Sequence, residues 1–123
     1  SGLNESENLD LITLYDVKGI LKFDKKGQIN VTSKKAIYNT KNNDTEFYHD
    51  VIVVYQEHNI SCDKIIAKFS KNYAKLSGNL IYNNISAKLF ADQMEIDLFN
   101  RTSKTSMINE KDKVKIITHN GIN

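Results

Sequence analysis

Apolar and polar residues alternate along much of this chain, and the three-to-four-residue spacing of an amphipathic helix is hard to find. Phe47, His49, Val51, Val53 and Tyr55, for example, occupy every second position. Period two is the spacing of side chains on one face of a β-strand. The pattern predicts a chain built almost entirely of strands.

Polar, turn-forming stretches separate the apolar runs, roughly every 9 to 17 residues. They are residues 24–27, 42–44, 57–59, 70–72, 83–84, 100–102, 111–112 and 120–121. Short turns at such a spacing join neighbouring strands into antiparallel hairpins. A succession of hairpins predicts a meander, a sandwich or a jelly roll.

The chain repeats when it is laid over itself with an offset of 29 residues. Four sets align in the first half of the unit: Val31, Ile60 and Leu89; Ser33, Cys62 and Ala91; Ala36, Ile65 and Met94; Tyr38, Ala67 and Ile96. In the second half, Phe47 aligns with Leu76, Asp50 with Asn79, Val51 with Leu80, and Val53 with Tyr82. Each unit predicts a strand and a return strand, and stacked units bury a continuous apolar seam.

The apolar phase slips inside each unit, because Ser33 and Ala36 lie an odd number of residues apart. Strict period-two geometry would turn one of the two outward, so the slip predicts a bulge or corner. A closed double layer would pack the seam fully, whereas a splayed one would leave an apolar slot. The sequence alone permits both.

Length and charge narrow the classes of function. A chain of 123 residues suits one domain, with residues 1–12 expected as a lead and 118–123 as a loose tail. The 17 basic and 15 acidic residues give a formal charge of +2 and are spread along the chain. No nucleic-acid partner is expected, because no concentrated basic field is present.

Catalytic and metal chemistry find little support. His49, His58 and His119 lack ligand spacing, so we expect no metal, no cofactor and no enzyme activity. Cys62 is interpreted as a small buried residue, since Ser33 and Ala91 share its position. Asp63 and Asp92 recur beside that position, which indicates a turn or edge hydrogen bond.

Several of these segments resemble known elements of one family. The runs 33–38, 62–65 and 91–96 are similar to the recurrent A-D-x-A/M-x-Y/I element of OstA-like β-jelly-roll domains, and residues 76–80 resemble their L-x-G-N-V return strand. The similarity spans residues 27–107, and the first copy departs from it at Ser33-Lys34 and His49-Asp50. Met107 followed by a strand-like 114–118 most resembles the LptC members, with LptA members as the alternative.

The resemblance implies an all-β, twisted antiparallel jelly roll that acts in the periplasm in lipopolysaccharide transport. It implies an N-terminal inner-membrane anchor ahead of residue 1, and as partners lipopolysaccharide, the inner-membrane export ABC transporter and an LptA-like protein bound by edge-strand addition. The edges expected to pair are residues 14–23 and 114–118. Acyl chains of lipid A would lie along the in-phase positions: Val31, Ala36, Tyr38, Phe47, Val51, Val53, Ile60, Ile65, Leu76, Leu80, Leu89, Met94 and Ile96.

Two alternatives stay open. A structural β-solenoid with a fully packed seam would hold no ligand. A β-sandwich hydrolase that uses Cys62 has only its fold class in its favour. Some aliphatic residues are expected on the outer face of the sheet, where they are either simply exposed to solvent or covered by another protein. They are Ile37, Ile52, Val54, Ile66 and Ile81.

Overall fold

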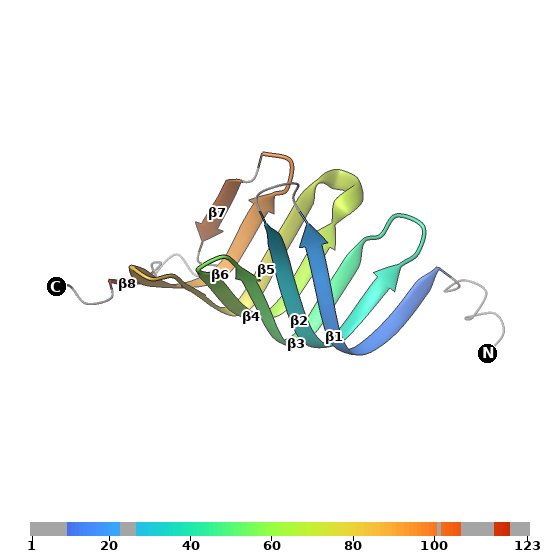
Figure 1. Cartoon of the computed structure of the whole chain (residues 1–123), viewed down its shortest axis with the longest axis horizontal. Coiled ribbons are helices and arrows are strands. Elements are labelled where there is room, and N and C mark those ends of the chain that lie inside the picture. Colours follow the sequence, from blue (N-terminus) through green and yellow to red (C-terminus); the bar gives the residue numbers. More distant parts are fainter. Residues whose placement is uncertain (1–9, 23–26, 101, 107–114, 119–123) are drawn as a thin grey trace.

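The computed structural model describes residues 10–22, 27–100, 102–106 and 115–118, and in these ranges the chain is almost entirely β-structure (Figure 1). The strands are β1 (Leu11–Lys22), β2 (Gln28–Asn39), β3 (Thr45–Tyr55), β4 (His58–Lys68), β5 (Tyr73–Asn83), β6 (Ala87–Asp97), β7 (Thr102–Ser106) and β8 (Lys115–Thr118). One short 3₁₀ turn, η1 (Phe69–Lys71), joins β4 to β5. The predicted all-β class is confirmed.

The strands form one sheet in the order in which they occur along the chain. Each of β1 to β6 pairs antiparallel with the next strand, and β8 pairs with β6 beyond β7. The repeat explains this order, because each 29-residue unit supplies one strand and its return strand. β1 begins at Leu11, which pairs with Asn39. The first strand thus includes the last two residues of the segment 1–12 that the sequence predicts as a lead.

The sheet is bent along a line that crosses every long strand, which we call the crease. The register shifts between Thr32 and Lys35, and again at 48–51, 61–64 and 77–80. The backbone has positive φ at Asp16, His49, Asp50, Gly78 and Asn79 on the return strands. The bulge that the phase slip predicts is therefore confirmed, and it sits at the same place in each unit.

The crease divides the sheet into two wings (Figure 1). Wing 1 contains residues 11–15, 35–39, 45–48, 64–68, 73–77, 93–97 and β7, and wing 2 contains residues 17–22, 28–33, 51–55, 58–62, 80–83, 87–91 and β8. The two apolar layers expected for a jelly roll are thus two halves of one folded sheet. Their inner faces share a single core. Phe47 of wing 1, for example, reaches Gly19 of wing 2: a Cβ atom added to Gly19 would lie 3.8 Å from Phe47 Cε1.

The turns lie near the predicted positions, with one exception. Residues 42–44, 70–72 and 83–84 connect strands, and Asn72 takes the left-handed conformation that ends η1. The turn predicted at 57–59 is instead Gln56–Glu57, because His58 and Asn59 already pair with Tyr55 and Val54. The predicted turns at 111–112 and 120–121 lie outside the described residues, as do residues 24–26 of the turn predicted at 24–27 and residue 101 of the turn predicted at 100–102.

Candidate functional site

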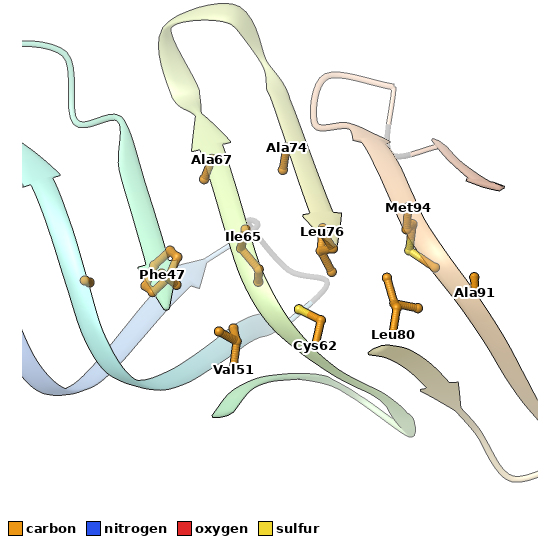
Figure 2. Packing of buried hydrophobic residues seen from close by; sticks show 11 residues of the cluster. Phe47, Val51, Cys62, Ile65, Ala67, Ala74, Leu76, Leu80, Ala91 and Met94 are labelled. Atoms are coloured by element: carbon orange, nitrogen blue, oxygen red, sulfur yellow. The ribbon is translucent and has the colours of Figure 1, made fainter. Parts of the chain in front are cut away.

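The inner face of the folded sheet carries parallel rows of apolar side chains, one residue from each strand. The row beside the crease in wing 2 contains Val17, Ser33, Val51, Cys62, Leu80 and Ala91, and the matching row in wing 1 contains Leu14, Ala36, Phe47, Ile65, Leu76 and Met94. Inward side chains follow one another in register across the sheet because the repeat and the bulge keep the alternation in phase. Figure 2 shows buried members of both rows, among them Phe47, Ile65 and Leu76 of wing 1 and Val51, Cys62 and Leu80 of wing 2.

In wing 2, burial decreases from the crease towards the free margin, which we call the mouth, whereas in wing 1 Ala67 and Ala74 remain buried one row out. Val51 and Ala36 are 0 % exposed and Leu80 is 1 % exposed. One row farther out, Val53, Ile60 and Leu89 are only partly buried, although they pack against the same core. The inner face is therefore buried at the crease and partly exposed at the mouth of wing 2.

The thirteen in-phase positions predicted from the sequence separate into three groups. Seven are buried in the core: Ala36, Phe47, Val51, Ile65, Leu76, Leu80 and Met94. Five are partly buried against it: Val31, Val53, Ile60, Leu89 and Ile96. Tyr38 is half-buried, and its hydroxyl group donates a hydrogen bond to Asn43 Oδ1 in the following turn. The aligned positions therefore point to one face, as the repeat predicts, and the second group lies where a ligand could reach.

Equivalent residues support the backbone at the crease. Ser33 Oγ donates to the carbonyl oxygen of Lys35 at 3.0 Å, and Cys62 Sγ makes the same contact with Lys64 at 3.5 Å. Burial raises the pKa of the Cys62 thiol to about 11, so the group is a protonated donor near neutral pH. The interpretation of Cys62 as a small buried residue is confirmed.

An aromatic stack forms the inner margin of wing 2. The ring of His58 stacks on Tyr55 with centroids 6.2 Å apart and on Tyr82 with centroids 5.7 Å apart. Asn84 Oδ1 accepts from the backbone N–H groups of Ser86 and Ala87, so its Nδ2 donates to Tyr82 Oη at 3.0 Å. The Tyr82 hydroxyl group also makes a hydrogen bond with His58 Nδ1.

The margin of wing 1 is joined across its turns. Asp44 Oδ1 accepts from the backbone N–H of Ser70 at 3.1 Å, and the carboxylate also accepts from Ser70 Oγ. The backbone N–H of Leu98 donates to the carbonyl oxygen of Asn72 at 2.9 Å. Successive hairpin turns therefore hold one another in place along this margin.

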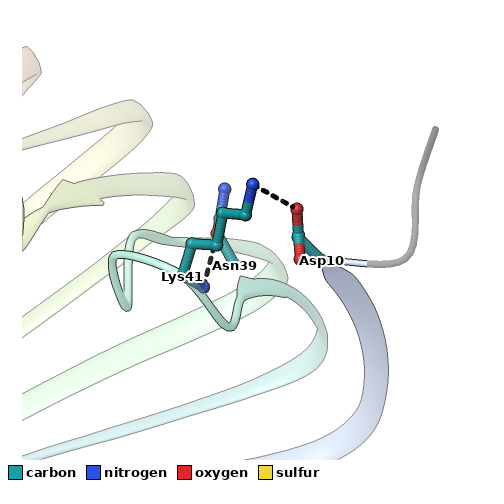
Figure 3. A network of polar contacts seen from close by, with 3 residues as sticks. All are labelled: Asp10, Asn39 and Lys41. Atoms are coloured by element: carbon teal, nitrogen blue, oxygen red, sulfur yellow. Dashed lines mark hydrogen bonds and ion pairs between the residues drawn. The ribbon is translucent and has the colours of Figure 1, made fainter.

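The first turn of this margin is held to the start of β1 (Figure 3). Lys41 Nζ lies 3.3 Å from Asp10 Oδ2, while the Lys41 backbone N–H donates to Asn39 Oδ1 at 2.9 Å. The backbone N–H of Thr40 donates to the carbonyl oxygen of Asp10 at 2.7 Å. The backbone bond is the firmer link, because an exposed ion pair contributes little on its own.

Sequence reasoning missed several residues of the interior. Phe69 and Leu98 pack against the core from turns, where no period-two pattern marks them. His58 lies on the inner face rather than in a turn, and alternation with Ile60 could have identified it. Ala74 is buried at the margin of wing 1 opposite Ala67, and of the two the repeat identifies only Ala67, which aligns with Tyr38 and Ile96.

Neither metal chemistry nor a membrane helix is indicated by the described residues. No group of three or more His, Cys, Asp or Glu side chains among them could hold a metal ion. No helix in the same ranges has the length and apolarity needed to cross a bilayer.

An open, folded antiparallel sheet with one apolar inner face is the β-jelly roll of LptA-like proteins. Comparison with solved structures finds this fold in LptH from Pseudomonas aeruginosa, described as the LptA homologous periplasmic component of the conserved lipopolysaccharide transport device. The two structures superimpose with a TM-score of 0.57 and 8 % sequence identity, over 87 % of this chain and 93 % of LptH. No protein-family model and no curated protein sequence matches the chain.

Proposed function

We propose that this protein is a non-enzymatic carrier in lipopolysaccharide transport that binds acyl chains of lipid A along its inner face. The observation that carries the proposal is the gradient of burial, with apolar rows that are packed at the crease and open to solvent at the mouth. Each methylene removed from water contributes roughly 0.8 kcal/mol, so a dozen carbons gain on the order of 10 kcal/mol gross. Smooth aliphatic walls suit transfer, since dispersion has little directional preference.

The likeness to LptH supports a periplasmic site of action and lipopolysaccharide as the cargo. We infer further that the protein acts as an LptC-like member, held to the inner membrane by an N-terminal helix, with an LptA-like free periplasmic role as the alternative. The coding sequence upstream of Ser1 tests this point. An apolar span of about 20 residues there favours the anchored member, and a cleavable signal favours the free one.

The proposed partners are the inner-membrane export ABC transporter and an LptA-like protein that adds to a sheet edge. β1 supports an edge contact, because large apolar residues are exposed on both of its faces. Ile12 and Leu14 on the inner face are 44 % and 42 % exposed, and Tyr15 and Ile20 on the outer face are 71 % and 60 % exposed. A strand with unpaired backbone groups and apolar flanks is suited to pairing with another chain.

A structural β-solenoid without ligand is the second candidate. The burial of Val51, Leu76 and Leu80 beside the crease favours it, since each of these side chains is at most 2 % exposed. The two candidates differ in the mouth rows, which a carrier needs for contact with lipid and a structural module does not.

Photo-crosslinking from adjacent positions of β3 separates the candidates. A benzophenone side chain at Val53 lies on the inner face near the mouth, whereas the same group at Ile52 lies on the outer face, where the native side chain is 44 % exposed. We expect lipopolysaccharide to crosslink to position 53 and not to position 52. No crosslink from position 53, or equal crosslinking from both positions, would exclude the carrier.

A further inference from the structure

The last return strand of the sheet differs from the two before it. On β3, two residues, His49 and Asp50, cross the crease opposite Asp63, and on β5 two residues, Gly78 and Asn79, cross it opposite Asp92. After β7, the register instead passes from Ser106 opposite Gln93 to Lys115 opposite Phe90. Along the chain, the eight residues 107–114 separate the partners of Gln93 and Phe90 on this side of β6, whereas on β5 the three residues 78–80 separate them.

The repeat explains why the strand does not simply continue. A 29-residue step from Leu80 and Tyr82 leads to Asn109 and Lys111, which are polar where an inner row needs apolar side chains. The place beside the wing 2 half of β6 is taken by β8, which brings Ile116 opposite Leu89. β8 is therefore a substitute strand from farther along the chain.

β8 is also the strand with the fewest partners. It makes four register pairs with β6, whereas β1 and β2 make eleven. Its connection to β7 spans eight residues, which can reach up to about 26 Å when extended. β7, by contrast, is joined to β6 by residues 98–101 alone. A short strand on a long connection can leave its own edge and still reach the same edge on a neighbouring molecule.

We propose that β8 is an exchangeable strand, which pairs with β6 of its own chain in the monomer and with residues 87–90 of a second copy in a dimer. A second copy is the partner because its β8 reproduces the same four register pairs. β1 of a second copy does not fit this place, since β1 has twelve residues and β7 already covers the wing 1 half of β6. The exchange does not depend on bound lipid.

Single-cysteine variants in a Cys62→Ala background test the exchange. Lys88→Cys and Ile117→Cys occupy a register pair of β6 and β8, and Glu95→Cys and Lys104→Cys occupy a matched register pair of β6 and β7. One protein of each pair is labelled with ¹⁵N, the two are mixed at high concentration, and the mixture is oxidised. Mixed disulfide-linked dimers are counted by mass spectrometry, which separates them from dimers of one variant.

We expect the 88–117 mixture to give mixed dimers about tenfold or more above the 95–104 mixture, because only β8 has a connection long enough to exchange. Equal yields from the two mixtures, or no mixed dimer in the first, would overturn the proposal. A double variant with both Lys88→Cys and Ile117→Cys supplies a second reading. Oxidation at low protein concentration locks β8 of this variant onto its own β6, so the oxidised protein should stay monomeric at high protein concentration. After reduction of the disulfide it should dimerise. A dimer that forms with the disulfide intact would also overturn the proposal.

Discussion

Asn79 Nδ2 donates a hydrogen bond to Asp63 Oδ2 at 2.8 Å, and this bond joins the neighbouring strands β4 and β5 at the crease. Asp63 also lies directly over Gly78, where an added Cβ would come within 2.6 Å of the carboxylate oxygen. The Gly-Asn pair and the aspartate of the preceding strand thus form one corner. The interpretation of Asp63 as a residue that makes a structural hydrogen bond is confirmed.

Gly78→Ala should destabilise the fold. Gly78 has φ +85°, which an alanine adopts only with strain, and the new methyl group would push into Asp63. We expect the free energy of unfolding to fall by about 1–3 kcal/mol, measured by urea denaturation at constant m-value.

Gly19→Ala is the matched control for Gly78→Ala. Its φ is not in the left-handed region, and the nearest atoms to the added Cβ, in Phe47 and Val31, are 3.8 Å away. The substitution should be neutral or stabilise by up to about 1 kcal/mol, because it restricts the unfolded chain. A loss at position 19 as large as that at position 78 would show that the corner geometry is not the cause.

Asp44→Ala should loosen the margin of wing 1. The carboxylate of Asp44 is bound to both the backbone N–H and the hydroxyl group of Ser70, which it holds at the start of the next hairpin turn. We expect a loss of about 0.5–2 kcal/mol, as for the removal of other side chains that bind backbone N–H groups. Hydrogen exchange at Ser70 should accelerate more than exchange at Tyr82 on the opposite wing, and equal acceleration at both would contradict a local role.

The sequence predicts the inner face well because the 29-residue repeat shows each position three times in the first half of the unit and twice in the second half. Ser33, Cys62 and Ala91 align in the sequence and lie in one buried row in the structure. Phe69 could not be found this way, since it packs from a turn in which side-chain direction depends on local backbone geometry rather than on alternation.

The C-terminal edge marks the other limit of sequence reasoning. Residues 114–118 are predicted as a strand, and β8 (Lys115–Thr118) confirms it. The partner of β8, the wing 2 half of β6, does not follow from the repeat, because the polar residues 109–113 interrupt the pattern. β8 pairs with the sheet edge that the other strands leave free. Which edge that is depends on how all the strands pair, so the local sequence of β8 does not reveal it.

Leu76→Ala tests how closely the rows beside the crease are packed. Leu76 is 2 % exposed and lies between Ile65 and Met94 in its row. We expect a loss of about 2–5 kcal/mol, since truncation removes buried methyl groups and leaves a cavity. Ile52→Ala on the outer face, where the side chain is 44 % exposed, should cost much less, and similar losses at both positions would contradict a core confined to the inner face.

Alkaline pH should destabilise the protein through Cys62. Its thiol has a pKa of about 11 in the folded chain against 9.0 for the free group, because burial disfavours the thiolate. The unfolded chain therefore loses this proton first as pH rises from 9 towards 11, and stability falls over that interval by about 1–3 kcal/mol. Below pH 9 the contribution is fully present.

The variant Cys62→Ser isolates this effect. A serine at position 62 can donate to the carbonyl oxygen of Lys64 as Ser33 donates to that of Lys35, and it has no group that ionises in this range. We expect urea midpoints measured at pH 8 and pH 10 to converge in the variant relative to the native protein. Tyr48 and Tyr73, whose pKa values are also raised, are present in both proteins and so cancel in the comparison. An unchanged difference between the two midpoints would show that the Cys62 thiol is not shielded from water by the crease.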